Sequence, residues 1–545
     1  MSSWTQSPTL DSRHFDVVVV GGGINGVAIA QECARGGKRT LLVEKDDFGA
    51  GTTSRSSRVI HGGLRYLEHG EIGLVRESLR EREQLLRSHP HLVRRKKFVL
   101  AIRDGSGLHS ALAIRAGLWL YGRFAGVARQ GSGGSEMEAA LQRGESLACF
   151  SYEDAQCEFP ERLIAEWLAG AIRLGAEVRN HTEVLELSLA AGRVRGVRLR
   201  DARSGAEWAV SCDAVINATG PWVDRFCAQT GVLTSKRMIG GVRGSHVVLP
   251  IFSGAPSHPV YTEAEDGRPI FLLPWNGQLL LGTTEVRDDG DPGDAAPSQS
   301  EMEYLFSALN RLIPGNGLTM RDARYAFAGV RPLPYSPGTI PAKISRGHQL
   351  IDHSDEGAQG LVSVIGGKLT TAARLARDCV RKIGMKTSEP AVEFCAAPSS
   401  DGICSALRQW AHQISGALGV SPETAFAIAE WHGVDALTVT KLAASDSVWR
   451  SGICAHTPHI LAEVAKAVRY ERAVTLGDIL LRRVPVAFGA CWSVECSREA
   501  AERIGYALGW TLSRIEEELE DFEAERTAFL HPRKSEQLSR RSGRR

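Results

Sequence analysis

The sequence predicts an α/β body with an inserted antiparallel sheet and an all-α C-terminal domain. Three observations support this: the length of the chain, a glycine-rich strand–turn–helix unit near its start, and the loss of strand-like segments after about residue 387. The chain has 545 residues, which is more than three times the roughly 150 residues of a typical domain. We therefore expect two or three domains rather than a single core. With 43% hydrophobic and 23% charged residues, and no long apolar run, the composition excludes disordered, collagen-like and integral membrane proteins.

The first element is a buried strand predicted at residues 15–20, which contain four consecutive valines. It runs into the turn Gly-Gly-Gly-Ile-Asn-Gly at 21–26 and an alanine-rich helix. A second strand at 40–43 ends at Glu44. Strand, glycine turn, helix, strand and terminal acid within about 30 residues predict a Rossmann-like dinucleotide site.

Each residue of this unit has a physical role. Gly21 permits the tight turn, Gly23 lets the backbone approach a pyrophosphate, and Gly26 lets the helix pack on the strand. The helix N-terminus presents N–H groups to the anion. Glu44 is expected to accept hydrogen bonds from the ribose hydroxyls and to disfavour a 2′-phosphate.

The loop after Glu44 favours FAD over NAD. Residues 49–57 read Gly-Ala-Gly-Thr-Thr-Ser-Arg-Ser-Ser, a small, hydroxyl-rich stretch that can follow a ribityl chain and phosphates. An NAD-binding fold would normally continue with another plain strand–helix unit. The sequence therefore predicts FAD as the cofactor.

The middle of the chain alternates between elements of this fold and an inserted sheet. A helix is predicted at 163–174, with strands at 184–187 and 194–199. A strand at 214–217 followed by Ala-Thr-Gly returns to the cofactor site. Alternating apolar residues at 246–249, 270–273 and 279–281 predict an antiparallel sheet inserted into the nucleotide fold.

The last strand of the α/β body is predicted at 361–365, followed by Gly-Gly-Lys-Leu-Thr-Thr and a helix at 372–383. The N-terminus of that helix can stabilise negative charge on a reduced flavin. Beyond a Pro/Ser-containing stretch at 396–401 the segments are helical. Helices are predicted at 403–418, 423–431, 460–471, 476–481 and 498–526.

These elements define the predicted domains. Residues 1–395 form the interleaved FAD-binding and substrate domains, with the substrate sheet at about 75–150 and 225–345. Residues 396–532 form the helical domain, and 533–545 form a basic tail. The formal charge is +2, and without the tail it becomes −3, so no nucleic-acid partner is expected.

The remaining composition bears on location. Eleven scattered cysteines without a Cys-x-x-Cys pair suit a reducing compartment, and no targeting peptide is expected at the N-terminus.

Cys454-x-His456-x-x-His459 lacks a fourth ligand at a familiar spacing, so no metal site is expected there. Arg94-Arg95-Lys96-Lys97 is interpreted as a solvated turn, with docking to anionic lipid as the alternative.

Several longer motifs together resemble one family. They are residues 57–68 (Ser-Arg-Val-Ile-His-Gly-Gly-Leu-Arg-Tyr-Leu-Glu), 217–222 (Asn-Ala-Thr-Gly-Pro-Trp), 244–246 (Gly-Ser-His), 329–333 (Gly-Val-Arg-Pro-Leu), 366–371 (Gly-Gly-Lys-Leu-Thr-Thr) and 476–483 (Leu-Gly-Asp-Ile-Leu-Leu-Arg-Arg). The chain resembles, over nearly its whole length, the FAD-dependent glycerol-3-phosphate dehydrogenases. This resemblance implies an amino-acid-oxidase-like α/β fold with a helical C-terminal domain. It also implies oxidation of sn-glycerol 3-phosphate to dihydroxyacetone phosphate, with electrons passing through FAD to a membrane quinone.

The resemblance also implies the site residues. The substrate would be bound by Arg65, Tyr66, His246, Arg331, Arg346 and Lys368. The cofactor would be bound by Gly21, Gly23, Ile24, Asn25, Gly26, Glu44, Thr53, Ser54, Ser57, His61, Gly62, Ala218, Thr219, Gly220, Gly367, Lys368, Leu369 and Thr370. A dianionic phosphate requires several fixed cations, which agrees with this set. The catalytic candidates for the base and alkoxide stabiliser are His61, His246 and Arg331, and the sequence does not choose among them.

A quinone reductase must touch the membrane, so the protein is expected in the cytoplasm at the inner face of the cell membrane, bound to an anionic lipid surface. Residues 108–129 combine large apolar side chains with Arg115, Arg123 and Arg129, and either a core helix or an interfacial helix fits them. A homodimer is a candidate assembly.

The chain departs from the family pattern in three places: Ala372-Ala373 where a Tyr-Arg pair is common, Cys-Glu-Phe-Pro-Glu-Arg at 157–162, and a short Pro-rich segment after Leu333. Two alternative functions stay open. One is an oxygen-using oxidase of the same fold acting on glycerol 3-phosphate, an amine or an amino acid. The other is a non-catalytic flavin-binding scaffold whose helical domain docks a partner.

Overall fold

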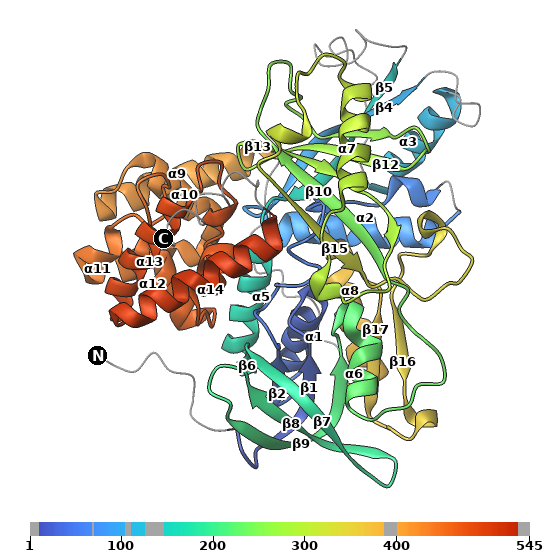
Figure 1. Ribbon diagram of the computed structural model, residues 1–545, viewed down its shortest axis with the longest axis vertical. Helices are drawn as coiled ribbons and strands as arrows, with labels where there is room; N and C mark the ends of the chain where they lie inside the picture. Colours follow the sequence, from blue (N-terminus) through green and yellow to red (C-terminus); the bar gives the residue numbers. More distant parts are fainter. Residues whose placement is uncertain (1–9, 68–69, 104–110, 126–146, 386–399, 532–545) are drawn as a thin grey trace, which may run out of the picture.

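A computed structural model describes residues 10–67, 70–103, 111–125, 147–385 and 400–531 of the chain. Two sheets with their covering helices form the α/β body, and a group of helices from the end of the chain packs against one side of it (Figure 1). This is the fold class that the sequence predicts: a mostly parallel sheet, an antiparallel sheet and an all-α C-terminal domain.

The first sheet holds the glycine turn at the end of its central strand. Strand β1 (His14–Val20) lies parallel to both β2 (Thr40–Val43) and β9 (Glu207–Asn217), and the strand order is β16-β17-β9-β1-β2-β6. Parallel strands place their carboxyl ends at one edge, which is where ligands bind in such sheets. The other strands are β6 (Glu177–Arg179), β7 (Thr182–Ala190), β8 (Arg193–Asp201), β16 (Gln349–Asp352) and β17 (Leu361–Ile365).

Helices cover both faces of this sheet because successive side chains of β1 point to opposite sides. Val17 and Val19 are buried in one hydrophobic cluster, and Val18 and Val20 in another. The first cluster contains side chains of α1 (Ile24–Arg35), α5 (Pro160–Arg173) and α8 (Ala372–Lys382), and the second contains α6 (Val223–Gln229). A continuous valine run therefore forms the buried centre of a doubly covered sheet.

The second sheet has nine strands and is mostly antiparallel. Its strands are β3 (Val59–Ile60), β4 (Val93–Arg103), β5 (Leu147–Cys157), β10 (Val242–Leu249), β11 (Val260–Glu263), β12 (Pro269–Trp275), β13 (Gln278–Gly282), β14 (Val286–Arg287) and β15 (Tyr325–Arg331). Helices α2 (Ile72–Ser88) and α3 (Ala111–Ala125) pack on one face, and α7 (Gln299–Leu312) packs on the other. Strand β3, directly after the hydroxyl-rich loop, joins this sheet to the cofactor domain.

The basic run at residues 94–97 is not a turn. It is the first part of β4, paired with β5 along its length. Acidic partners neutralise three of its cations: Arg94 contacts Glu430 at 2.7 Å, Arg95 contacts Glu83 at 2.6 Å, and Lys96 contacts Glu158 at 3.5 Å. The interpretation as a solvated turn was wrong because neighbouring segments supply the opposite charges, which the local sequence does not show.

The C-terminal domain contains α9 (Ser400–Leu418), α10 (Pro422–His432), α11 (Ala436–Ser445), α12 (Leu461–Tyr470), α13 (Val494–Leu508) and α14 (Leu512–Leu530). The helix predicted at 498–526 is two helices, because Gly509 adopts a left-handed conformation (φ 72°) that ends α13. Thr511 then caps α14 by accepting a hydrogen bond from the Arg514 N–H. The segment predicted as a helix at 476–481 is a π-helical turn, η10 (Asp478–Arg483).

Short helical turns complete the described chain: η1 (Leu64–Leu67), η2 (Gly220–Trp222), η3 (Pro292–Asp294), η4 (Met320–Asp322), η5 (Pro341–Lys343), η6 (Ser354–Glu356), η7 (Leu369–Thr371), η8 (Gly433–Asp435), η9 (Ser447–Arg450) and η11 (Val486–Phe488). In the described part of the chain, no helix has both the length and the apolar character that crossing a bilayer requires.

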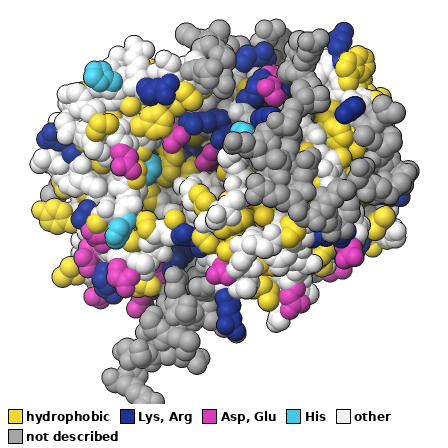
Figure 2. Space-filling view, turned by 90° about the horizontal axis from the view of Figure 1, so that it is seen from above, with side chains coloured by type: hydrophobic (Ala, Val, Ile, Leu, Met, Phe, Trp, Pro, Cys, Tyr) yellow, Lys and Arg dark blue, Asp and Glu magenta, His cyan; other side chains and the backbone are white. Residues whose placement is uncertain are grey.

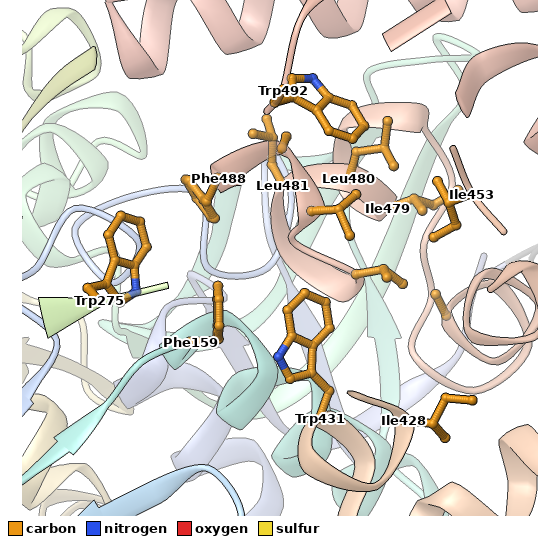
Figure 3. Close-up of a cluster of buried hydrophobic side chains, with 14 of the residues drawn as sticks. Phe159, Trp275, Ile428, Trp431, Ile453, Ile479, Leu480, Leu481, Phe488 and Trp492 are labelled. Atoms are coloured by element: carbon orange, nitrogen blue, oxygen red, sulfur yellow. The ribbon is translucent and has the colours of Figure 1, made fainter. Parts of the chain in front are cut away.

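Aromatic side chains join the helical domain to the α/β body (Figure 3). Phe159 lies 4.9 Å from Trp431 and 6.2 Å from Trp275, measured between ring centroids. Phe488 of the helical domain lies 5.8 Å from Trp275. These rings belong to one hydrophobic cluster that runs from the antiparallel sheet into the helical domain, so the two parts share a core.

A buried ion pair crosses the same boundary. Arg162 of α5 donates two hydrogen bonds to Glu471, at 2.9 and 3.0 Å, and a third to the Arg483 carbonyl at 2.6 Å. Burial would raise the pKa of Glu471, but Arg162 and Lys466 hold it well below its usual range. Arg162 belongs to the 157–162 segment that departs from the family pattern.

Replacing Glu471 with Gln is expected to lower the free energy of unfolding by about 3–5 kcal/mol, because Arg162 would keep its charge in a buried site. Urea denaturation followed by tryptophan fluorescence measures the loss. The matched control is Glu186→Gln, which breaks an exposed pair with Arg198 and should cost less than about 1 kcal/mol. Equal losses in the two variants would contradict the structural role of the buried pair.

Candidate functional site

A cleft of about 860 Å³ opens between the two sheets at the carboxyl end of β1. One end is lined by the glycine turn and Glu44, and the other by Tyr66, Arg331 and Lys368. The volume is in the range of sites that hold cofactors and small substrates. The cleft therefore joins the predicted cofactor and substrate sites.

The glycine turn is packed too closely for a side chain at Gly21 and Gly26, while Gly23 has room beside it. A Cβ atom at Gly26 would lie 1.8 Å from the Gly21 carbonyl oxygen, and one at Gly21, whose φ is 101°, would lie 2.6 Å from the Ala218 oxygen. At Gly23 the nearest atom would be Thr53 Oγ1, 3.4 Å away. The turn thus brings the N-terminus of α1 to the cleft, and the Ile24 N–H donates to Thr53 Oγ1 at 3.1 Å.

Glu44 ends β2 inside the cleft. Its carboxylate accepts hydrogen bonds from the backbone N–H groups of Gly22 at 2.6 Å and Asp46 at 2.9 Å. Burial, followed by the charge of Asp46, raises its pKa to about 7. A polar ligand that donates hydroxyl groups to this carboxylate would stabilise its ionised form.

The pattern of polar atoms fits FAD. The Asn25 side chain donates to the Gly366 carbonyl at 3.2 Å, while its Oδ1 is buried without a hydrogen-bond partner. A free acceptor beside the glycine turn, a carboxylate at the end of β2 and open space at Gly23 match what an adenine dinucleotide requires.

Most predicted cofactor residues line the cleft. They are Gly21, Gly23, Ile24, Asn25, Glu44, Thr53, Ser57, His61, Ala218, Thr219, Gly220, Gly367, Lys368, Leu369 and Thr370. Three others lie behind its wall: Gly26 packs on Gly21, the Ser54 hydroxyl donates to the Gly49 carbonyl, and the Gly62 N–H donates to the Tyr121 hydroxyl. These three shape the wall rather than line it.

Three cations converge at the substrate end of the cleft. Arg331 at the end of β15 donates to Thr283 Oγ1 at 3.1 Å and to the Thr284 carbonyl at 3.3 Å. Arg346 donates to Glu285 at 2.7 Å through Nη2, while its Nη1 is buried without a partner. Lys368 donates to Ser78 Oγ at 2.8 Å.

Lys368 also lies 4.5 Å above the ring of Tyr66, a cation–π contact that fixes both side chains in the wall. Glu285 is the carboxylate that pairs with this group, through Arg346. Among the described side chains of this group, three cations and one carboxylate leave an excess of two positive charges, while Glu77 and Glu71, which do not line the cleft, also act on Lys368.

The same charges depress one another's pKa values. Burial and then the neighbouring Arg346 lower the pKa of Arg331 to about 10. Burial is the main reason that the pKa of Lys368 falls to about 8; Glu77 and Glu71 oppose this shift, and Arg346 adds to it. A bound dianion would relieve this repulsion, so the cations form a site prepared for negative charge.

The two histidine candidates occupy different places. His61 lines the cleft, and burial, then Lys368 and Arg346, lower its pKa to about 3. His246 is buried behind the cleft wall: its Nε2 hydrogen-bonds Ser57 Oγ at 2.8 Å and its ring stacks on Phe327 at 5.0 Å. Burial, with Arg331, also lowers the pKa of His246 to about 3.

The structure therefore brings five of the predicted substrate and catalytic residues to one wall: His61, Tyr66, Arg331, Arg346 and Lys368. It does not bring His246 there, and its nearest link to the cleft is Ser57. Arg65 lies in the short turn η1, but its side chain is outside the described residues.

Sequence reasoning missed two groups at the site. Glu285 and Thr283 bind the two arginines from the segment after β13, where no local motif marks them. Arg482 and Phe529 of the helical domain line the cleft as well. The Leu-Arg-Arg end of the 476–483 motif was a signal for Arg482, although it does not reveal which part of the body Arg482 meets.

Two family models match most of the chain. The model of the FAD dependent oxidoreductase family matches residues 16–374, and that of the C-terminal domain of alpha-glycerophosphate oxidase matches residues 398–515. A solved structure of a glycerol-3-phosphate dehydrogenase from Bacillus halodurans, complexed with FAD, has the same fold. Its TM-score is 0.76 at 23% identity, with 95% of this chain and 96% of that chain covered.

Curated relatives extend the similarity to the sequence. The glycerol-3-phosphate dehydrogenase of Synechocystis sp. is 35% identical over 541 residues, which is 94% of this chain and 97% of the relative. Glycerol-3-phosphate dehydrogenase 2 of Mycobacterium tuberculosis is 31% identical over 531 residues, with 94% of this chain and 88% of the relative covered. The chain belongs to the family of FAD-dependent glycerol-3-phosphate dehydrogenases.

Proposed function

We propose that the protein oxidises sn-glycerol 3-phosphate to dihydroxyacetone phosphate and passes the electrons from FAD to a membrane quinone. The observation that carries the substrate assignment is the excess of two positive charges formed by Arg331, Arg346 and Lys368 with Glu285. A phosphate monoester is a dianion near neutral pH, because its second pKa is about 6. An amino acid offers a single carboxylate, which fits this charge less well.

The cations hold and orient the substrate. Arg346 Nη1 is buried without a partner and can donate to a phosphate oxygen without breaking its bond to Glu285. Arg331 is fixed by its bonds to Thr283 and Thr284, so it is preorganised for an anionic oxygen. Binding of the dianion would displace water from this wall and strengthen these contacts.

His61 is our candidate for the base. Its imidazole is neutral at physiological pH because of burial and the neighbouring cations, so it can accept a proton. A phosphate dianion bound to Lys368 and Arg346 would cancel much of their effect and raise the pKa of His61, which makes it a stronger base once substrate is present. His246 acts as a positioning residue, since it holds Ser57 from behind the wall.

The reaction balances with these groups. The carbinol hydroxyl gives its proton to His61, while Arg331 stabilises the negative charge that develops on the oxygen. The chemistry that a bound FAD would supply is acceptance of the hydride that leaves the carbinol carbon. The alcohol carbon loses two electrons and becomes the ketone of dihydroxyacetone phosphate.

Helix α3 supports contact with a membrane. Arg115, Trp119 and Arg123 lie four residues apart on its outer face, and Trp119 is 69% exposed. Figure 2 shows cationic and hydrophobic side chains interspersed on the end of the molecule seen from above. Tryptophan with flanking arginines is the combination that interfacial helices use.

The inner face of the same helix reaches the cofactor wall. Leu118 and Tyr121 are buried, and the Tyr121 hydroxyl donates to Asp154 at 2.8 Å and accepts from the Gly62 N–H at 2.8 Å. The buried face of α3 therefore belongs to the core, and we propose its exposed face, which carries Trp119, as the membrane contact. The parts of the segment at 108–110 and 126–129 lie outside the described residues.

Oxygen as the electron acceptor is the second candidate, because the model that matches residues 398–515 describes the C-terminal domain of alpha-glycerophosphate oxidase. A non-catalytic scaffold is less consistent with a cleft that keeps three partly buried cations and a neutral histidine. Both alternatives make distinct predictions for the purified protein.

Adding glycerol 3-phosphate to the purified flavoprotein without oxygen should bleach the flavin absorption. Arg331→Ala should keep its bound flavin but reduce it at least about 100-fold more slowly, as expected for loss of an oxyanion donor. The matched control, Arg321→Ala, changes an exposed arginine and should reduce at the native rate. Bleaching by an amino acid instead would overturn the substrate assignment.

The rate at which the reduced flavin is reoxidised distinguishes a quinone from oxygen as the electron acceptor. A soluble quinone should restore the flavin colour rapidly, with little peroxide formed in air. Rapid reoxidation by air with one peroxide per substrate would instead support the oxidase.

The value of kcat/KM should rise above about pH 6 as the substrate becomes a dianion and fall above about pH 8. The fall follows from Lys368, whose pKa of about 8 in the free enzyme means that it loses its charge there. Lys368→Arg should abolish the alkaline limb near pH 8, because an arginine side chain keeps its charge well above that pH. The control Lys343→Arg, on the surface, should leave the limb at pH 8, and an unmoved limb in Lys368→Arg would refute the assignment.

Trp119→Ala should weaken binding to vesicles that contain anionic phospholipid by about tenfold, or about 1.4 kcal/mol, because the ring would no longer be buried in the headgroup region. Vesicle flotation measures the bound fraction. Leu512→Ala is the control, since Leu512 is 81% exposed but lies on the helical domain. Equal binding by the two variants would exclude α3 as the membrane contact.

A further inference from the structure

We propose that the C-terminal domain binds a thiophilic divalent cation, with Zn²⁺ as the best fit, at a cluster formed by Cys454, His456 and Cys496. One ligand atom of each residue lies within 4.8 Å of the other two. His456 Nδ1 is 3.3 Å from Cys496 Sγ, and both cysteines are buried. Thiolate and imidazole donors at such separations match the requirements of Zn²⁺.

The chain holds two of the ligands on a closed loop. Ile453 N–H donates to the His459 carbonyl at 2.9 Å, and Gly452 and Ile460 form a short β-bridge. The loop between these contacts carries Cys454 and His456 at its start. Its ends are therefore fixed by backbone bonds, and the two ligands enter the cluster from one side.

The third ligand comes from the first turn of α13. Ser493 caps this helix by accepting a hydrogen bond from the Cys496 N–H, which places Cys496 near the positive end of the helix dipole. The cap fixes the start of the helix and so fixes the position from which the Cys496 side chain enters the cluster. A second thiol, Cys491, precedes the helix, is exposed, and has its Sγ 3.6 Å from the His456 carbonyl oxygen.

Cys491 thus lies beside the cluster but outside the three ligand atoms that are close to one another, so we expect a water molecule at the fourth position of a tetrahedral site. This set differs from the sequence motif Cys454-x-His456-x-x-His459. The Nδ1 of His459 hydrogen-bonds Glu463 at 2.9 Å and its ring stacks on Trp431 at 3.6 Å, so it points away from the cluster. Cys496, which is 40 residues beyond His456 in the sequence, takes the place of His459 as the third ligand.

A second group with ligand spacing, Asp47, His181 and Asp478, is less suited to a cation. Arg482 and Arg483 already neutralise Asp47, and Asn180 donates to both carboxylates. At the cysteine cluster no such cation contacts the ligand atoms in the described residues. The charge and the donor atoms therefore both favour the cysteine cluster.

A cation here would strengthen the contact between the helical domain and the antiparallel sheet. The loop before Cys491 receives hydrogen bonds from that sheet: the Phe488 carbonyl accepts from Gln278 at 2.9 Å and from the Tyr325 hydroxyl at 3.0 Å. Arg324 donates to the Ala490 carbonyl. Fixing Cys496 and the 453–459 loop together would hold this segment in place, which is a structural rather than a catalytic role.

The test uses the purified full-length flavoprotein, stripped with a chelator and then titrated with Co²⁺. Tetrahedral thiolate coordination should give d–d absorption at longer wavelengths than the flavin, saturating at one Co²⁺ per chain and lost on addition of Zn²⁺. The Zn²⁺ form should show Zn–S distances of about 2.3 Å by X-ray absorption. Zn²⁺ should also raise the thermal unfolding midpoint of the stripped protein.

Cys496→Ser should lower Zn²⁺ affinity by at least about 100-fold, since even groups that only orient ligands contribute 10–100-fold. His456→Ala should also weaken binding, and it should leave the fold intact because His456 is exposed. The matched control is Cys404→Ser, a partly exposed cysteine of α9, which should bind Zn²⁺ normally. Bound flavin content verifies the fold of each variant.

Three results would overturn the proposal. They are the absence of Co²⁺–thiolate absorption in the native protein, equal Zn²⁺ affinity in Cys496→Ser and Cys404→Ser, and a mass lower by two hydrogens that traces to a disulfide within the cluster. The last result would identify the cluster as a redox-active thiol pair instead.

Discussion

The structure depends on one buried carboxylate, Asp47, which ties the helical domain to the cofactor loop. Its oxygens accept two hydrogen bonds from Arg483, at 2.7 and 2.8 Å, and others from Arg482 and Asn180. A buried charge of this kind is tolerated only when its partners are all in place. Because Asp47 follows Glu44 by three residues, the same bonds fix the segment that ends the glycine unit, and they bring Arg482 to the cleft wall.

At the opposite end of the cleft the balance of charge is reversed. Arg331, Arg346 and Lys368 outnumber Glu285, and their pKa values are depressed or their donors left unpaired. The protein thus keeps a positive surplus where a dianion would bind, while the carboxylate of Glu44 faces the cofactor end. The aromatic and ionic contacts at the domain boundary stabilise the folded state, and this stabilisation offsets the repulsion among the three cations.

Much of the fold was predictable because it is encoded locally. The valine run, the glycine turn and Glu44 follow one another in sequence and obey strict backbone geometry, and the structure confirms strand, turn, helix and strand with little change. The helix predicted at 498–526 was wrong only where Gly509 interrupts it. The basic run at 94–97 was misjudged because its partners, such as Glu430, are distant in sequence.

The sequence by itself determined the cofactor unit, the order of domains and the family, because those depend on residue types at fixed spacing. Only the tertiary structure decided which side chains meet. It placed His61 in the cleft and His246 behind Ser57. It also brought Glu285 into contact with Arg346 and the Cys454 side chain close to that of Cys496. Such contacts join segments tens to hundreds of residues apart, and no local periodicity records them, since they arise from the packing of sheets and helices against one another.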